Sequence, residues 1–166
     1  MHAVFLDLEK AFDRIPRELI WHALRSHGVP EAYVDWTKLL YRNTTSAVRC
    51  PVGTSPLFDI NVGVHQGSAL SPLLFILCMD TITADLQSPH PWSLLYADDV
   101  FLAHKDREEL QHQVQRWKSR LDEYGMRLNT KKTEYMECGP ETDGTISIDG
   151  EHLKKVSNFK YLGSVL

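Results

Sequence analysis

The feature that most constrains this sequence is a pair of adjacent acids between two short apolar runs, in the stretch from Leu94 to Ala103. Apolar runs joined by a few polar residues are typical of a β-hairpin, and here the turn would carry Asp98 and Asp99. Successive side chains of a strand point to opposite faces, so a turn is needed to bring both carboxylates to one place. Asp is also common in ordinary turns, because its carboxylate accepts hydrogen bonds from nearby backbone N–H groups. Whether these acids have a function therefore depends on the rest of the chain.

A third acid interrupts the apolar stretch near the N-terminus. Residues 2–8 are typical of a buried strand, and Asp7 is the one acid within it. A carboxylate among apolar neighbours costs several kcal/mol unless it is paired, hydrogen-bonded or bound to a metal. The alternative is that Asp7 caps the next turn.

The size and composition describe one ordinary domain, residues 1–166. A net charge of −4 argues against a basic nucleic-acid-binding face within this chain. The three cysteines, Cys50, Cys78 and Cys138, form no C-x-x-C motif, so reduced thiols inside a cell are expected. The longest apolar run, residues 73–79, is too short to span a bilayer, so no membrane is expected as a partner.

Local patterns predict four helices and several short strands. The helices are expected over residues 16–27, 31–42, 72–86 and 106–124. Hairpins are expected around residues 51–55 and at Asp149–Gly150, a strand at 134–136, and a strand or turn at 159–163. Ser71 suits the N-cap of the third helix, with Pro72 in its first turn. The apolar stripes of the second and fourth helices are expected in the core: Tyr33, Val34, Trp36, Leu39 and Leu40 in the second, and Leu110, Val114, Trp117 and Leu121 in the fourth.

The order of these elements predicts an α+β fold, a split β-α-β arrangement with an antiparallel sheet and helices on one face. In such a fold the first strand and the acidic hairpin can be neighbours, which would bring Asp7 beside Asp98 and Asp99. Three converging acids repel one another unless cations neutralise them. Oxygen ligands without His or Cys favour Mg²⁺ or Mn²⁺, and two such ions can clamp both reacting oxygens of a phosphoryl transfer.

Five blocks of the sequence resemble the palm of reverse transcriptases, especially those of non-LTR (LINE-type) retrotransposons. In order they are FLDLEKAFD at 5–13, HQGSALSPLLF at 65–75, YADD at 96–99, GMRLNTKKT at 125–133 and FKYLG at 159–163. Each is a weak match alone, and all five in order are specific. Viral RNA-dependent RNA polymerases usually carry Gly-Asp-Asp at the hairpin and lack an aromatic gate. Retroviral and LTR-type enzymes tend to have a shorter segment between the first two blocks, and group II intron maturases are the nearest competitor.

The resemblance implies a role for the acids and for one lysine. Asp7, Asp98 and Asp99 match the carboxylates that hold two Mg²⁺ ions, with Mn²⁺ as an alternative. Lys132, or its neighbour Lys131, matches the lysine that helps to protonate or neutralise the leaving pyrophosphate.

The resemblance also implies where substrates bind. Phe12 matches the aromatic steric gate that rejects a ribose 2′-OH, and its alternative reading is core packing. Gln66 and Gly67 match the loop that lies against the nascent base pair. Phe159, Lys160, Tyr161, Leu162 and Gly163 match the primer grip, which positions the primer 3′ end.

The implied function is RNA-directed DNA polymerisation, in which a dNMP is transferred to a primer 3′-OH. The partners would be an RNA template, a DNA primer and dNTPs, in an intracellular setting that for a retroelement enzyme fits the nucleus. The resemblance also implies that fingers and thumb are largely missing from these residues, and that they or an endonuclease are encoded upstream or downstream. Little or no processive synthesis is then expected from the 166 residues, because positioning supplies much of polymerase catalysis. The alternative is a truncated, catalytically incompetent remnant that acts at most as a binding module.

Overall fold

A computed structural model describes residues 1–87, 93–139, 142–161 and 164–165. Of these, residues 160, 161, 164 and 165 are described by their backbone alone. The chain divides into two compact units. The sheet unit comprises residues 1–11 and 82–166, and the helical unit comprises residues 12–81. A single domain over 1–166 stays a prediction.

The sheet unit is built on a five-stranded sheet with the strand order β11-β8-β1-β7-β6. These strands are β1 (His2–Asp7), β6 (Ser93–Tyr96), β7 (Asp99–His104), β8 (Glu134–Glu137) and β11 (Lys154–Val156). Three of the four pairings are antiparallel, as predicted, and β11 instead runs parallel to β8. The difference arises because the short hairpin of β9 (Ser147–Ile148) and β10 (Glu151–His152) lies between them and reverses the chain once more.

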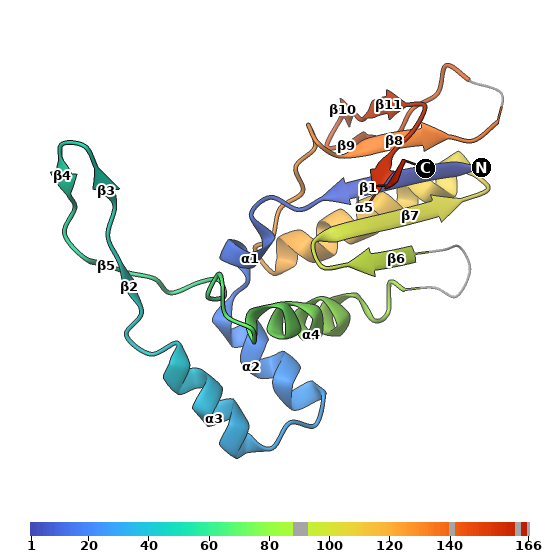
Figure 1. Ribbon diagram of the computed structural model, residues 1–166. Coiled ribbons are helices and arrows are strands. Elements are labelled where there is room, and N and C mark those ends of the chain that lie inside the picture. Colours follow the sequence, from blue (N-terminus) through green and yellow to red (C-terminus); the bar gives the residue numbers. More distant parts are fainter. Residues whose placement is uncertain (88–92, 140–141, 162–163, 166) are drawn as a thin grey trace. The chain divides into compact units, whose positions relative to one another are not determined.

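Helix α5 (Arg107–Glu123) packs against β1 and β7, and Figure 1 shows it crossing behind the sheet. Asp106 is its N-cap, and the carboxylate accepts hydrogen bonds from the N–H groups of Glu108 and Glu109. A glycine at φ +71°, Gly125, follows its C-terminus, as the sequence predicts. The predicted apolar stripe is buried at every position: Leu110, Val114, Trp117 and Leu121.

The opposite face of the sheet has its own apolar cover. Strand alternation places Phe5 and Phe101 together on this face, with ring centroids 4.8 Å apart. Phe159, which is buried, lies against Phe5 with ring centroids 3.7 Å apart. It directly precedes the pair β12 (Lys160–Tyr161) and β13 (Ser164–Val165). Both faces of β1 are therefore covered.

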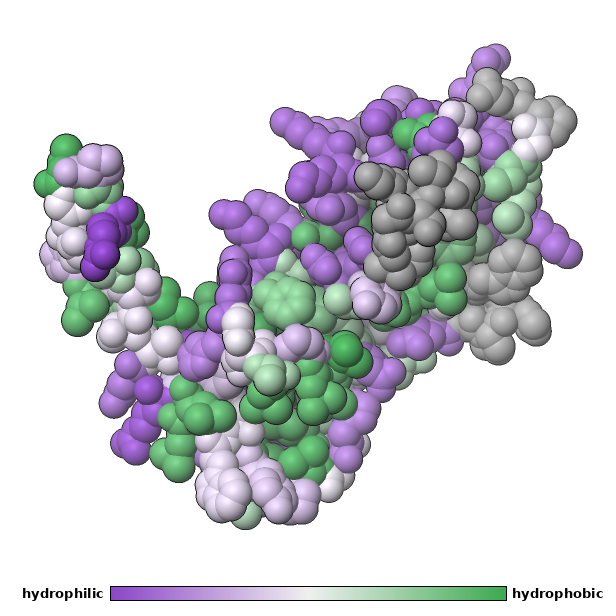
Figure 2. Space-filling view, viewed as in Figure 1, coloured by the Kyte–Doolittle hydropathy of each residue, from purple (hydrophilic) through white to green (hydrophobic). Residues whose placement is uncertain are grey.

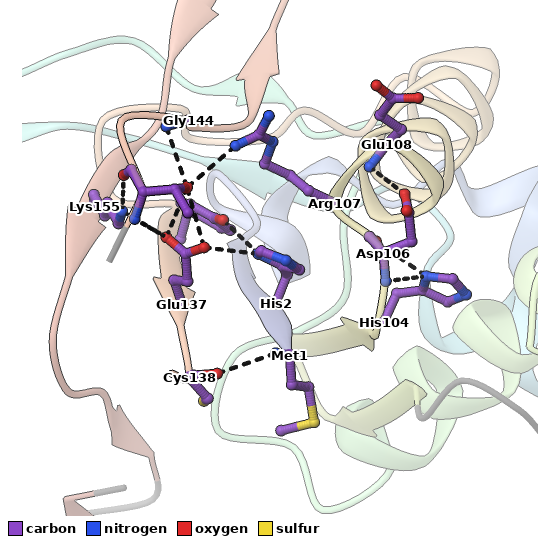
Figure 3. A network of polar contacts seen from close by, with 12 residues as sticks. Met1, His2, His104, Asp106, Arg107, Glu108, Glu137, Cys138, Gly144 and Lys155 are labelled. Carbon is purple, nitrogen blue, oxygen red and sulfur yellow. Dashed lines mark hydrogen bonds and ion pairs between the residues drawn. The ribbon is translucent and has the colours of Figure 1, made fainter. Parts of the chain in front are cut away.

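A polar network holds the beginning of β1 against β8 (Figure 3). The N–H group of Cys138 donates to the Met1 carbonyl at 2.7 Å. The Glu137 side chain is 5% exposed and accepts a 2.7 Å hydrogen bond from Lys155, which is the main reason why its pKa falls to about 2. The Nδ1 atom of His2 lies 3.8 Å from a Glu137 oxygen. These contacts fix the register of β1, and with it the position of the strand's other end.

The helical unit contains four helices and a narrow β-ribbon. The helices are α1 (Ala11–Arg14), α2 (Arg17–Ser26), α3 (Glu31–Leu40) and α4 (Ser71–Thr83). The first residue of α1 and the last two residues of α4 belong to the sheet unit. The ribbon pairs β2 (Thr45–Ser46) with β5 (Phe58–Asp59) and β3 (Arg49–Cys50) with β4 (Gly53–Thr54), which confirms the hairpin predicted around 51–55. Across the described ranges of the whole chain, the structure contains no helix long and apolar enough to cross a membrane.

The prediction that the whole stripe of α3 lies in the core is wrong. Val34 is buried, whereas the remaining four residues are between 55% and 63% exposed: Tyr33, Trp36, Leu39 and Leu40. Within its unit α3 packs against α2, and one helix covers only a narrow line of its neighbour's surface. In Figure 2 green, apolar side chains occupy part of the surface over α3 and part of the tip of the ribbon, among paler and more polar ones.

The N-cap predicted for α4 is also wrong. Ser71 is the first residue of the helix, and its hydroxyl donates to the His65 carbonyl at 2.6 Å. The first helical hydrogen bond runs from the Leu74 N–H to the Leu70 carbonyl at 3.0 Å, so Leu70 occupies the cap position. The helix ends at Thr83, three residues before the predicted end at Leu86.

Candidate active site

Two of the predicted acids lie directly opposite each other in the sheet unit. Asp7 is the last residue of β1, Asp99 is the first of β7, and the antiparallel register pairs them. The Cα atoms of such pairs are about 4.5–5.5 Å apart and their side chains share one face of the sheet. The prediction that the first strand and the acidic hairpin are neighbours is confirmed.

The turn of the hairpin places the third acid beside this pair. Tyr96 pairs with Asp99, which leaves Ala97 and Asp98 as the two residues of the turn. Ala97 has a φ of +53°, a left-handed conformation that costs an L-residue about 1–2 kcal/mol. Asp98 is exposed, whereas Asp7 and Asp99 are half-buried. The tight turn keeps Asp98 and Asp99 adjacent at one end of the sheet.

The electrostatics of these acids show that they repel one another. Burial is the largest cause of the raised pKa of Asp7; the charge of Lys132 opposes it and the charge of Asp98 adds to it. Burial, then Asp98, then Asp7 raise the pKa of Asp99. The site therefore holds unfavourable negative charge that a cation would relieve. We call Asp7, Asp98 and Asp99 the acidic cluster.

The segment after Gly125 runs alongside Asp7. The Asn129 N–H donates to the Asp7 carbonyl at 2.8 Å, and the Asp7 N–H donates to the Thr133 hydroxyl at 3.3 Å. The Asn129 side chain also hydrogen-bonds the Asp7 carboxylate and lowers its pKa. Of the two lysines that the resemblance offers, Lys132 is the one whose charge acts on Asp7.

Asn129 and the buried Thr133 are residues whose contacts with Asp7 the sequence patterns do not predict. The signal that could have found them is their position directly before β8, which pairs with β1. Residues that lead into a strand beside Asp7 must pass close to it.

The helical unit gathers the three predicted substrate-binding residues around one open pocket of about 490 Å³. The Phe12 ring forms part of its wall and is stacked on Phe75, with centroids 4.5 Å apart and planes 11° apart. Gln66 and Gly67 lie on the exposed part of the wall. The other lining residues are Ser68, Ala69, Ser71 and Pro72.

The loop that carries Gln66 and Gly67 is held at the residue before them. The His65 carbonyl accepts hydrogen bonds from the Ser68 N–H at 3.2 Å and from the Ser71 hydroxyl at 2.6 Å. The His65 ring stacks on Tyr41 with centroids 4.3 Å apart. Gly67 has a φ of +85°, where a glycine avoids the strain of other residues.

The predicted primer grip is described in part. Phe159 packs in the core on the same face of the sheet as Asp7 and Asp99, because Phe5 and Asp7 are two residues apart on β1. Lys160 and Tyr161 form β12. Leu162 and Gly163 lie outside the described residues.

The donor set of the acidic cluster suits a hard divalent cation, since it offers carboxylate oxygens only. Their mutual repulsion is the physical sign that a cation would be favourable there. In the part of the chain that the structure describes, no three His, Cys, Asp or Glu side chains are grouped as a ready set of metal ligands. The type of donor in the acidic cluster fits a divalent cation.

A mainly antiparallel sheet with acids where the first strand meets a tight hairpin, backed by α5, is a polymerase palm fold. The chain belongs to the reverse transcriptase (RNA-dependent DNA polymerase) family, whose pattern it matches over residues 1–166. Members of this family use divalent metal ions. The fold and family predicted from the sequence are thus confirmed.

Its relatives include Pol polyproteins of R2 retrotransposable elements, which are non-LTR elements. The chain is 29% identical over 177 residues to the Retrovirus-related Pol polyprotein from type-2 retrotransposable element R2DM of Drosophila melanogaster, covering 95% of this chain and 17% of the relative. It is 26% identical over 185 residues to the type-1 retrotransposable element R2 polyprotein of Nasonia vitripennis, covering 99% of this chain and 18% of the relative. The chain therefore spans less than a fifth of these two proteins.

Among solved structures, the chain resembles the Candida tropicalis telomerase in complex with a TWJ fragment of telomeric RNA, with a TM-score of 0.69. The match covers 92% of this chain and 28% of the telomerase at 15% sequence identity. At that identity the similarity establishes the fold.

Proposed function

We propose that the acidic cluster is the nucleotidyl-transfer centre of an RNA-directed DNA polymerase that adds dNMP to a primer 3′-OH. The observation that carries this proposal is the pairing of Asp7 with Asp99, which joins acids from two distant parts of the sequence on one face of the sheet. Burial and the neighbouring acids raise the pKa of Asp7 and of Asp99, and perturbed carboxyl pKa values are common at functional sites.

Asp7, Asp98 and Asp99 would hold two Mg²⁺ ions, with Mn²⁺ as an alternative. When bound, such ions supply charge that activates the attacking hydroxyl and stabilises the leaving phosphate oxygen. Asn129 orients Asp7 through its backbone and side-chain hydrogen bonds. Lys132, whose positive charge already acts on Asp7, would neutralise the departing pyrophosphate.

The pocket of the helical unit would receive the sugar and base of the incoming dNTP. Its volume of about 490 Å³ lies within the common range for small-molecule sites, about 300–1,000 Å³. The Phe12 ring, fixed by stacking on Phe75, is a rigid surface that would exclude a ribose 2′-OH. Gln66 and Gly67 would lie against the new base pair, and the segment from Phe159 to Gly163 would hold the primer on the RNA template.

The test is addition of a single nucleotide to oligo(dT) on poly(rA), at high protein concentration, with Mg²⁺ or Mn²⁺. We expect addition by the wild-type chain with little processive synthesis, and a rate at least about 100-fold lower in Asp98→Asn. Asp143→Asn, which removes one exposed carboxylate from the same unit, is the matched control and should keep the wild-type rate.

Two results would contradict the proposal. Equal rates for Asp98→Asn and the control would show that the acidic cluster does not act in the transfer. A wild-type chain that adds no nucleotide with either metal would favour the non-catalytic binding module.

A further inference from the structure

Two segments of the helical unit lie side by side next to the pocket, residues 12–16 and residues 62–66, and we call them the paired segments. The Val64 N–H donates to the Phe12 carbonyl at 2.8 Å, and the Gly63 N–H donates to the Ile15 carbonyl at 2.8 Å. One segment carries the Phe12 ring, and the other ends at Gln66, which Gly67 follows. Their separation therefore determines how far the ring is from the exposed wall of the pocket.

Gly63 allows this close approach. A Cβ atom at this position would lie 2.7 Å from the carbonyl oxygen of Asp13, closer than real Cβ contacts come. The φ of Gly63 is +82°, which adds a conformational reason for glycine. The backbone of the paired segments is thus set at a fixed and short separation.

A side-chain hydrogen bond completes the pairing at the end nearest the pocket. The Gln66 Nε2 atom donates to Asp13 Oδ1 at 2.7 Å. A hydrogen bond to an ionised carboxylate is shorter and stronger than one between neutral groups. Asp13 follows Phe12 in the chain, so this bond ties the residue next to Phe12 to Gln66, another residue that lines the pocket.

The two walls differ in how they are supported. Phe12 is half-buried and stacked on Phe75, whereas Gln66 and Gly67 are exposed. The loop is held on one side by the Ser71–His65 hydrogen bond and on the other by Asp13. Steric rejection of one added hydroxyl requires that neither wall can shift by the size of that group.

We propose that Asp13 is a positioning residue for sugar selection, which fixes Gln66 relative to the Phe12 ring and so sets the discrimination between deoxynucleotides and ribonucleotides. This inference rests on the proposed function, because it requires the pocket to receive the incoming nucleotide. We expect Asp13 to contact neither the sugar nor the reacting atoms. It acts through Gln66.

The experiment measures single-nucleotide addition with thymidine triphosphate and with its ribo form, and compares their kcat/KM values. Loss of one hydrogen bond changes such a ratio by about fivefold, so Asp13→Ala should lower the preference for the deoxynucleotide about fivefold. Asp13→Asn keeps an oxygen that accepts from Gln66 and should retain the wild-type preference within about twofold. Asp35→Ala removes an exposed acid of α3 and is the matched control.

Thermal denaturation separates positioning from folding. Asp13 is exposed, so Asp13→Ala should melt within about 2 °C of the wild type. A variant that no longer unfolds cooperatively would overturn the inference, because Asp13 would then be structural.

The measured nucleotide preferences distinguish failure of this inference from failure of the proposed function. An unchanged preference in Asp13→Ala, or an Asp13→Asn variant that loses preference as the alanine variant does, overturns the inference and leaves the proposed function standing. A wild-type chain that adds neither nucleotide overturns the proposed function, and this inference with it.

Discussion

The sheet unit and the helical unit bury their apolar side chains to different extents. In the sheet unit every residue of the predicted α5 stripe is buried, and both faces of β1 are covered. In the helical unit the predicted stripe of α3 is mostly exposed, as are several apolar residues of the ribbon: Val48, Val52, Leu57 and Phe58. A sheet offers broad faces on which a whole helix stripe can pack, whereas a single neighbouring helix offers a narrow one. Periodicity predicts which face of a helix is apolar, and the partner decides how much of it is buried.

The largest expected effect separates two tryptophans, one in each unit. Trp117 is 2% exposed, and Trp117→Ala should cost about 3–5 kcal/mol of unfolding free energy. Trp36 is 63% exposed, and Trp36→Ala should change stability by less than about 0.5 kcal/mol. Urea denaturation followed by circular dichroism measures both. A similar cost for both variants would show that the α3 stripe is packed in solution and would remove the contrast between the units.

The next effect tests whether the paired segments are the tightly packed part of the helical unit. Gly63 and Gly28 both have positive φ, +82° and +72°, but a Cβ at Gly28 meets nothing within 4 Å. Gly28→Ala should cost about 1–2 kcal/mol from backbone strain. Gly63→Ala should cost about 1–3 kcal/mol more, because the new methyl group meets the Asp13 backbone. Equal losses in urea denaturation would mean that the paired segments are free to separate.

The smallest effect concerns the pH dependence of the sheet unit. A raised carboxyl pKa means that the folded state binds the proton more tightly than the unfolded state. The stability from Asp99 is therefore present below the ordinary pKa of 3.8 and is lost as the pH rises through the raised pKa. Without divalent cations, Asp99→Asn should raise the melting temperature at pH 7 by up to about 3 °C and leave it unchanged at pH 3.

A second acid of the same unit provides the control of opposite sign. The N–H groups of Glu109 and Glu108 hold the pKa of Asp106 below its ordinary value, so its contribution is present above pH 3.8 and is lost as the pH falls through the lowered pKa. Asp106→Ala should therefore lower the melting temperature at pH 7. A fall at pH 7 for Asp99→Asn as well would contradict the repulsion within the acidic cluster.

Much of the sheet unit could be predicted because local and long-range signals agree there. The cap at Asp106, the stripe of α5 and the glycine at 125 each determine local structure. The pairing of Asp7 with Asp99 followed from the order of the elements. The parallel direction of β11 did not follow, because it depends on an intervening hairpin whose packing has no local signal.

The candidate site shows the same limit. The resemblance identified Asp7, Phe12 and Gln66 by their place in motifs, and the structure brings Phe12 and Gln66 to one pocket. The Asp13–Gln66 hydrogen bond joins residues 53 positions apart, and no periodicity predicts it. Polar contacts between distant loops depend on the completed backbone path, which local patterns do not contain.

The central place of β1 in the sheet has a consequence for synthesis on the ribosome. This strand is made before both of its partners, since His2 pairs with His104 on one side and with Glu137 on the other. At about 5–20 residues per second, the second partner follows the first strand by roughly 7–27 s. Until β8 has been made, the apolar β1 has at least one unpaired edge, which can pair with other chains. The acidic cluster therefore assembles only after β7 has been translated, and β1 is open to such pairing until then.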